Sequence, residues 1–95
     1  MTFCVRLLPP ARDDLIGVSN FPAEVAPNTA LRAADVVDRA LKWLEMFPER
    51  APVNGLGGRD LSVPFGQAGY VIRYRIEGGN VILLRIFHSR EDRSS

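Results

Sequence analysis

The sequence is poor in the residue types that build disulfides, metal sites and membrane spans. Its 95 residues include one cysteine and one histidine, which excludes an internal disulfide and leaves too few ligands for a metal site. The single cysteine, Cys4, falls within an apolar strand pattern, so we expect a buried thiol in a reducing compartment. The sequence contains no run of about 18 apolar residues and no secretory signal pattern. We therefore expect a cytoplasmic protein without metal or cofactor.

Charge is nearly balanced over the whole chain but unevenly distributed along it. From Arg50 onward, seven arginines stand against four acidic residues, a balance of +3, whereas residues 1–49 carry five basic and seven acidic residues, a balance of −2. Only Lys42 is a lysine, and arginine can bind carboxylates and phosphates through two parallel hydrogen bonds where lysine cannot. The hydrophobic fraction of 46% is typical of a folded chain, and we expect one domain spanning 1–95.

A hairpin signal lies near the end of the chain. A Gly-Gly pair at 78–79 separates two β-rich segments, 69–77 and 80–88, and both glycines can adopt the positive φ of a tight hairpin turn. In an uninterrupted register, a two-residue loop at this place pairs Ile72 with Arg85. The sequence therefore predicts two antiparallel strands that form the C-terminal half of a sheet.

Alternation along these strands sorts their side chains into two faces. One face is predicted to be a core, formed by Tyr70, Ile72, Tyr74, Ile76, Val81, Leu83 and Phe87. The opposite face is predicted to carry Val71, Arg73, Arg75, Ile82, Leu84, Ile86, His88 and Arg90. Arg85 then falls on the core side, where a carboxylate such as Asp38 would pair with it. We expect function on the basic face, with the histidine at its end.

The remaining segments complete a two-layer α+β fold. Besides the hairpin, we expect strands at 2–8 and 59–64 and helices at 10–25 and 28–47. The second helix shows apolar residues at helical spacing, and Val36 and Trp43, seven positions apart, widen its apolar face. The order β-α-α-β-β-β predicts a helical hairpin packed on an antiparallel sheet.

Five segments resemble a known family. They are VRLLPPARDDL at 5–15, ALKWLEMFPER at 40–50, RDLSV at 59–63, GYVIRYRI at 69–76 and VILLRIFHSREDR at 81–93. Each segment alone is a generic strand or helix pattern, but in this order and length the chain resembles the RelE/ParE superfamily of bacterial toxins. The resemblance implies the toxin of a type II toxin–antitoxin system, held in a hetero-oligomer with its cognate antitoxin.

The branches of this superfamily differ in chemistry. RelE-type members are ribosome-dependent endoribonucleases that use arginine with lysine or histidine on the concave sheet face, whereas ParE-type members lack that site and poison DNA gyrase. The arginine that follows Gly-Tyr in RelE-type toxins is Val71 here, and the lysine positions of the preceding strand fall near Asp60 and Ser62. Only His88 and Arg90 match nuclease positions. We therefore favour a gyrase inhibitor without catalytic residues; the alternative is a RelE-type mRNA endoribonuclease that uses His88 and Arg90. A third hypothesis is a toxin-like module whose activity is lost or different but which still binds an antitoxin.

Two binding surfaces are expected from this comparison. The target-binding surface is the basic C-terminal edge, formed by Arg59, Arg73, Arg75, His88, Arg90 and Arg93, although a structural salt bridge is an equal alternative for Arg59. The antitoxin-binding surface combines apolar side chains, Val36, Trp43 and Phe21, with Arg73 and Arg75. A disordered antitoxin tail that folds on contact could cover both kinds of surface.

Overall fold

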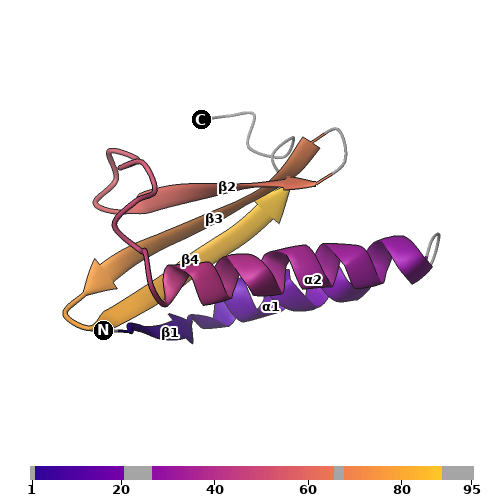
Figure 1. The fold of residues 1–95 in the computed structure, drawn as a ribbon, viewed down its shortest axis with the longest axis horizontal. Coiled ribbons are helices and arrows are strands. Elements are labelled where there is room, and N and C mark those ends of the chain that lie inside the picture. Colours follow the sequence, from indigo (N-terminus) through magenta and orange to yellow (C-terminus); the bar gives the residue numbers. More distant parts are fainter. Residues whose placement is uncertain (1, 21–26, 66–67, 89–95) are drawn as a thin grey trace.

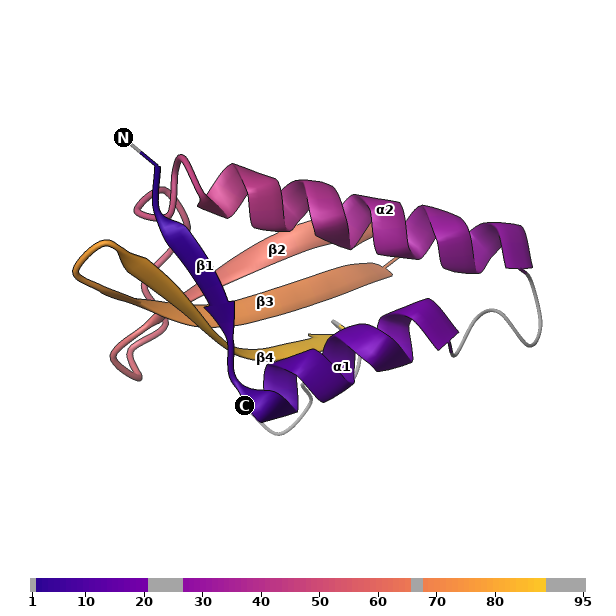
Figure 2. The same cartoon turned by 90° about the horizontal axis from the view of Figure 1, so that it is seen from below.

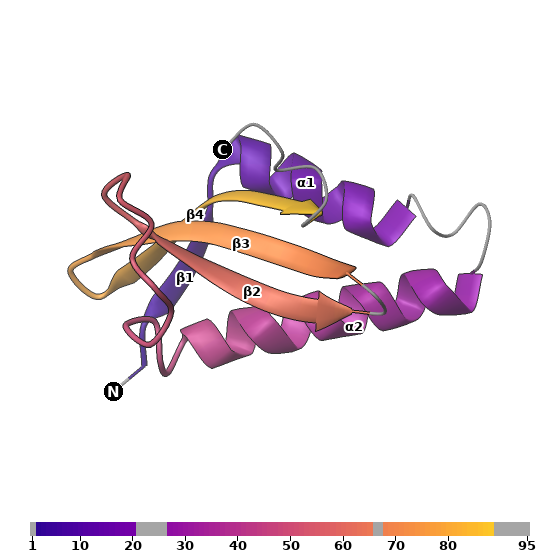
Figure 3. The same cartoon turned by 90° about the horizontal axis from the view of Figure 1, so that it is seen from above.

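The computed structural model describes residues 2–20, 27–65 and 68–88. Its elements follow the order β1 (Cys4–Leu7), α1 (Pro9–Asn20), α2 (Pro27–Leu44), β2 (Arg59–Phe65), β3 (Ala68–Glu77) and β4 (Asn80–His88). The two helices lie side by side against one face of the sheet (Figures 1 and 2). Figure 3 shows the other face, over which no helix passes. The predicted two-layer α+β fold is therefore confirmed.

The sheet is mixed rather than wholly antiparallel. Its strand order is β1-β4-β3-β2, and β3 runs antiparallel to both of its neighbours. Strand β1 pairs with β4 in parallel, with Val5 opposite Val81, which differs from the predicted all-antiparallel sheet. Parallel neighbours need a long crossover, and the helix pair with β2 and β3 supplies it. Cys4, predicted to be buried, is exposed. It alternates with Val5, which packs against the core cluster, so Cys4 lies on the sheet face away from the helices.

The helices differ modestly from their predicted bounds. Helix α1 ends at Asn20, and residues 21–26 lie outside the described part of the chain. Helix α2 begins at Pro27, where a proline fits the first turn, and ends at Leu44, three residues before the predicted end. No helix in residues 2–20, 27–65 or 68–88 is long and apolar enough to cross a membrane.

The core lies between the helix pair and the sheet. Its buried members come from both layers and from the loop after α2: Ala11, Ala33, Val37, Leu44, Ala51, Val63, Tyr70, Ile72, Tyr74, Val81, Leu83 and Ile86. Tyr74 is fully buried, and its hydroxyl donates a hydrogen bond to the Pro48 carbonyl oxygen. Burial raises the pKa of Tyr74, with the nearby Arg59 charge opposing the shift, so the phenol stays neutral and acts as a donor.

An extra residue in β4 divides the β3–β4 ladder into two registers. Tyr74 lies opposite Leu83 as predicted, but Arg73 lies opposite Arg85, so Leu84 has no opposite residue on β3. Such a bulge reverses the faces of every later residue in its strand. The uninterrupted register predicted from the sequence is therefore wrong beyond Leu83.

The bulge moves four side chains to the face opposite the predicted one. Ile86 lies opposite Ile72 and is 2% exposed, so it belongs to the core rather than to the basic face. His88 lies opposite Tyr70 and turns to the helix side with it. Arg85 and Phe87 turn to the sheet face away from the helices. Alternation alone could not reveal this reversal, because one added residue leaves the hydrophobic pattern almost unchanged.

A carboxylate from α1 stabilises the bulged part of β4. Strand β1 ends at Leu7, and the Leu8 amide donates the last bond of that edge to the Leu83 carbonyl oxygen. Beyond it, Asp14 accepts the Ile86 N–H at 2.9 Å and the Arg85 Nε and Nη2 groups at 2.7 and 3.2 Å. The partner of Arg85 is therefore Asp14 and not the predicted Asp38. The Asp14 side chain therefore supplies hydrogen-bond acceptors along the part of the β4 edge that β1 does not cover.

Asp38 lies elsewhere, on the solvent side of α2. Its carboxylate pairs with Lys42 one turn along the helix, at 3.3 Å. Both groups are mostly exposed, and such pairs one helical turn apart add only about 0.3–0.5 kcal/mol. Because Asp38 points to solvent and pairs with Lys42, the predicted Arg85–Asp38 pair does not form.

Asp14→Ala should reduce the free energy of unfolding by about 1–3 kcal/mol, because the Ile86 amide and the Arg85 guanidinium both lose their charged acceptor. Urea denaturation of the purified protein measures this change. Asp13→Ala is the matched control, since Asp13 is exposed on the same helix and its loss should change the free energy by less than about 0.5 kcal/mol. Equal stabilities for the two variants would contradict a structural role for Asp14.

Candidate functional site

The candidate site is the sheet face that the helices leave uncovered, visible in Figure 3 and named the open face below. Register and alternation give it two neighbouring cross-strand rows. The first row is Asp60, Arg73 and Arg85, and the second is Ser62, Val71 and Phe87. Arg75, two residues after Arg73 on β3, lies on the same face.

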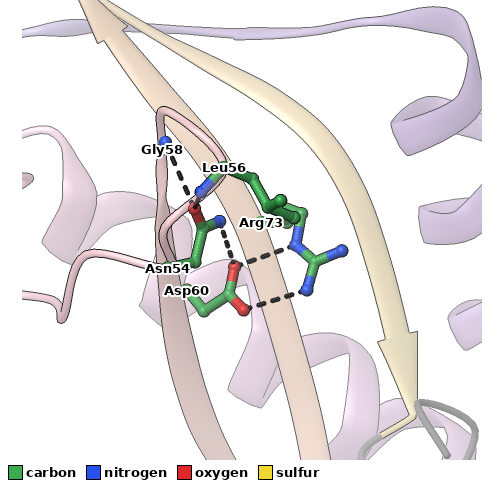
Figure 4. A network of polar contacts seen from close by, with 5 residues as sticks. All are labelled: Asn54, Leu56, Gly58, Asp60 and Arg73. Atoms are coloured by element: carbon green, nitrogen blue, oxygen red, sulfur yellow. Dashed lines mark hydrogen bonds and ion pairs between the residues drawn. The ribbon is translucent and has the colours of Figure 1, made fainter. Parts of the chain in front are cut away.

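Arg73 is held in one orientation at the centre of the open face. Its Nε and Nη2 groups donate to the two carboxylate oxygens of Asp60 at 3.0 and 3.1 Å. The Asn54 side-chain amide donates to the same carboxylate at 2.9 Å, so Asp60 lies between the amide and the guanidinium (Figure 4). The guanidinium carbon also lies 5.2 Å from the centroid of the Phe87 ring, within cation–π distance.

The ion pair with Arg73 lowers the pKa of the Asp60 carboxyl group. Both side chains are about three-quarters buried, with exposed fractions of 24% and 27%. The hydrogen bonds from Arg73 hold the pKa of Asp60 below its ordinary value, aided by the Asn54 amide and opposed by partial burial. Asp60 therefore stays ionised at neutral pH and keeps Arg73 in place.

Other arginines on or beside the open face also have internal partners. The Arg75 guanidinium pairs with Glu77 on the same strand, Arg85 pairs with Asp14, and the Nε group of Arg6 donates to the Asn80 side-chain oxygen. Four guanidinium groups thus stand against three carboxylates in this region. The open face is polar and rich in arginine, but its charge is largely compensated.

Arg59 lies away from this cluster. It is opposite Tyr74 on β3, which places it on the helix side, and its Nη1 group donates to the carbonyl oxygens of Glu49 and Ala51 at 3.1 and 2.7 Å. Of the two roles expected for it, this geometry fits the structural one, with carbonyl groups in place of a carboxylate partner. Arg59 fastens the loop between α2 and β2.

His88 is separated from the arginines that it was predicted to join. Its ring makes an edge-to-face contact with Tyr70, with centroids 5.6 Å apart, at the helix-side end of the sheet. The bulge at Leu84 is the cause, because it turns His88 away from the face of Arg73. Arg90 and Arg93, the other predicted members of the basic edge, lie outside the described residues.

The apolar residues proposed for antitoxin binding are only half-buried. Val36 and Trp43 pack against the core cluster, and the Trp43 ring lies 5.8 Å from that of Phe47. Phe21 lies outside the described residues. The most exposed large hydrophobic side chains of the described chain are Ile16 at 51%, Met46 at 58%, Val53 at 66% and Leu56 at 75%. Sequence reasoning missed the last two, although a valine and a leucine within the glycine-rich run 51–58 were a visible signal.

Comparison with known proteins identifies relatives along nearly the whole chain. Residues 5–93 match the family model described as the ParE toxin of the type II toxin–antitoxin system parDE. Toxin RelE1 of Caulobacter vibrioides is 38% identical over 98% of this chain and 100% of its own length. Toxin RelE3 of the same organism is 35% identical over 94% of this chain and 97% of its own length.

Solved structures show the same fold. The chromosomal ParDE toxin–antitoxin system from P. aeruginosa superposes with a TM-score of 0.75 and 20% identity, over 92% of this chain and 96% of that chain. The toxin–antitoxin complex RelBE2 from Mycobacterium tuberculosis gives a TM-score of 0.60 and 26% identity, over 93% and 99%. The ParDE and RelBE2 structures thus share the helix pair and the mixed sheet of this chain.

The Arg73–Asp60 pair should make the free energy of unfolding depend on pH. Because the pKa of Asp60 is lower in the folded than in the unfolded chain, the ionised pair stabilises the fold above the ordinary value of 3.8 and ceases to do so as pH falls through the folded pKa. Between pH 5 and pH 2, the wild type should therefore lose more free energy of unfolding than Asp60→Asn. Urea denaturation at both pH values measures the difference, and identical losses would contradict it.

Proposed function

The chain belongs to the ParE toxin family and is the toxin component of a type II toxin–antitoxin system; from this we propose that it inhibits DNA gyrase by binding and that a cognate antitoxin neutralises it. On this proposal no covalent step occurs. The toxin acts in the cytoplasm as a ligand of another protein, with the open face as its target-binding surface.

The observation that carries the proposal is the uncharged row of the open face. Ser62, Val71 and Phe87 lie side by side across β2, β3 and β4. By the family resemblance, RelE-type toxins carry a lysine near the position of Ser62 and an arginine at the position of Val71. Cleavage through a ribose 2′-OH needs a base, an acid and stabilisation of the charged phosphate. This row supplies none of the three.

The position of His88 supports the same conclusion. It is the single histidine of the sequence, and it contacts Tyr70 on the helix side instead of facing Arg73. A general base must lie within hydrogen-bond reach of the proton it removes, with stabilising charges on the same reacting group. The bulge at Leu84 places the histidine and the central arginine on opposite faces of the sheet.

Pairing of the arginines also favours a protein target over a nucleic acid. Phosphate groups would have to displace Asp60 from Arg73 and Glu77 from Arg75, both of which are in ion-pair contact. Nucleic-acid affinity depends strongly on arginine and lysine that neutralise phosphates. A surface of paired charges with an aromatic ring is instead suited to a protein partner that meets it with hydrogen bonds and complementary charge.

A second candidate function is mRNA cleavage of the RelE type. The observation that favours it is the naming of the two curated relatives as RelE toxins, at 38% and 35% identity. On this alternative, His88 would transfer a proton and Arg90 would stabilise the phosphate. Arg90 follows β4 directly in the sequence.

For the antitoxin, we propose a partner with an acidic amphipathic tail. The two solved relatives are named as ParDE and RelBE systems, in which toxin and antitoxin occur together. In this chain, the tail would cover Val36 and Trp43 on α2 and reach Arg73 and Arg75 with its carboxylates. A hetero-oligomer follows, with the toxin inactive until the antitoxin is removed.

The purified toxin should inhibit supercoiling by gyrase and leave ribosome-bound mRNA intact. His88→Ala should retain this inhibition, because binding involves no proton transfer. If the protein is a nuclease, the same change should instead lower cleavage by about 10²–10⁴-fold, the usual contribution of a general acid or base. Supercoiling and cleavage assays on the two proteins separate the functions: messages cut by the wild type and spared by His88→Ala would overturn the proposal.

Arg75→Ala should weaken gyrase inhibition by up to about tenfold, since an exposed charged contact contributes on the order of 1 kcal/mol. The effect should shrink as salt concentration rises. Arg39→Ala is the matched control, because Arg39 is also an exposed arginine in an ion pair, at 3.0 Å from Asp35, but lies on α2. Equal inhibition by both variants would remove Arg75 from the target-binding surface.

A further inference from the structure

The loop between α2 and β2 presents two hydrophobic side chains to solvent. Leu56 is 75% exposed and Val53 is 66% exposed, the highest values among the large hydrophobic side chains whose burial the structure describes. Isolated exposed hydrophobic residues are common on protein surfaces. This loop is unusual because its backbone is fixed around Leu56.

Hydrogen bonds of Asn54 fix the conformation of this loop. The side-chain oxygen of Asn54 accepts the N–H groups of Leu56 and Gly58 at 2.8 and 3.2 Å (Figure 4). Its backbone N–H donates to the Gly58 carbonyl oxygen at 2.9 Å. Its side-chain nitrogen donates to Asp60. One asparagine thus fixes the turn that carries Leu56 and joins it to β2.

Glycines complete the shape of the turn. Gly55 and Gly57, on either side of Leu56, have φ values of 81° and 85°, which other residues rarely adopt. A Cβ atom at Gly58 would lie 2.5 Å from the Tyr74 carbonyl oxygen, so the loop backbone approaches β3 more closely than any other residue would allow. Leu56 therefore stands on a turn whose conformation is set before any partner binds.

The loop is continuous with the open face. Asn54 and Arg73 bind the same Asp60 carboxylate, as Figure 4 shows. A Cβ atom built on Gly58 would lie 3.7 Å from the Cβ of Arg75. Leu56 and the two arginines of β3 therefore belong to one end of one surface.

We propose that Leu56, with Val53 beside it in the loop, is an apolar anchor that enters a pocket on the target protein. The pocket should have a polar rim of complementary charge, because Arg73 and Arg75, each paired with a carboxylate, border the loop. This inference rests on the proposed function in one respect, namely that the target is a protein. The inference adds the residue, Leu56, through which the toxin would contact its target.

Physical reasons favour this occupant over a nucleic acid. Interface hot spots are side chains that fill well-packed pockets, surrounded by polar contacts that exclude water. A side chain on a rigid turn loses little conformational freedom when it binds. An aliphatic side chain offers neither the positive charge nor the flat ring that single-stranded nucleic acids select. The antitoxin and a second copy of the toxin remain as outcomes of the test.

The test compares Leu56→Ser with Ile16→Ser, a control that removes an exposed aliphatic side chain from α1. Growth arrest on expression, supercoiling inhibition by purified toxin, antitoxin affinity and oligomeric state are measured for each, at equal protein levels. Leu56→Ser should lose about tenfold or more in growth arrest and in inhibition, as truncated hot spots do, with antitoxin affinity unchanged. Ile16→Ser should inhibit like the wild type.

The outcomes separate this inference from the proposed function. If the wild type arrests growth without inhibiting gyrase, the proposed function fails, while Leu56→Ser still tests the anchor through growth arrest. Undiminished arrest by Leu56→Ser overturns the anchor. Loss of antitoxin affinity alone assigns Leu56 to the antitoxin, and loss of a toxin dimer alone assigns it to self-association; either result also overturns the anchor.

A second variant tests the rigidity of the turn. Asn54→Ala keeps Leu56 but removes three side-chain hydrogen bonds that fix the loop. Inhibition should fall several-fold while the far-ultraviolet circular dichroism stays unchanged, because the anchor must then be ordered on binding. Inhibition equal to that of the wild type would overturn the claim that the preformed turn contributes to recognition.

Discussion

The contact between the Asp14 carboxylate and β4 stabilises the strand register on which the arrangement of the open face depends. The carboxylate satisfies the Ile86 amide and the Arg85 guanidinium at the edge of β4 that β1 does not reach. Its position stabilises the extra residue, Leu84, which shifts the register of the hairpin. Beyond that point each side chain of β4 points to the opposite face from the one that simple alternation gives. The side chains on the open face therefore depend on a register that one helix–strand contact stabilises.

The arrangement of the open face follows from this shift. Phe87 comes to lie beside Arg73, and Asp60 fixes the guanidinium from the other neighbouring strand. His88 turns to Tyr70 on the helix side. The result is a surface of paired charges with one aromatic ring, and the proposed gyrase inhibition depends on such a surface. A site that used His88 together with Arg73 would require both side chains on one face, and this ladder keeps these two residues on opposite faces.

The sequence predicted the order of elements because each has a strong local signal. Prolines mark the helix starts, apolar spacing marks α2, and the glycine pair marks the hairpin, whose strand 80–88 agrees with β4 at both ends. The bulge had no such signal, since Leu83, Leu84 and Ile86 are hydrophobic in either register. Parallel pairing of β1 and the choice of Asp14 as a partner depend on contacts between distant segments, which periodicity does not encode. The exposure of Leu56 depends on how its glycine-rich loop folds back on β3, which the composition of the loop does not indicate.

The proposed function requires that the open face of the toxin binds gyrase directly. The most direct measurement is to place a photo-reactive amino acid at Ser62, an exposed and uncharged position in the second row of that face, and to identify its cross-linked partner in cells under growth arrest. The same residue at Ile16 on α1 serves as the reference position. We expect a covalent adduct with a gyrase subunit from position 62 and none from position 16. An adduct of position 62 with ribosomal RNA or a ribosomal protein would contradict it.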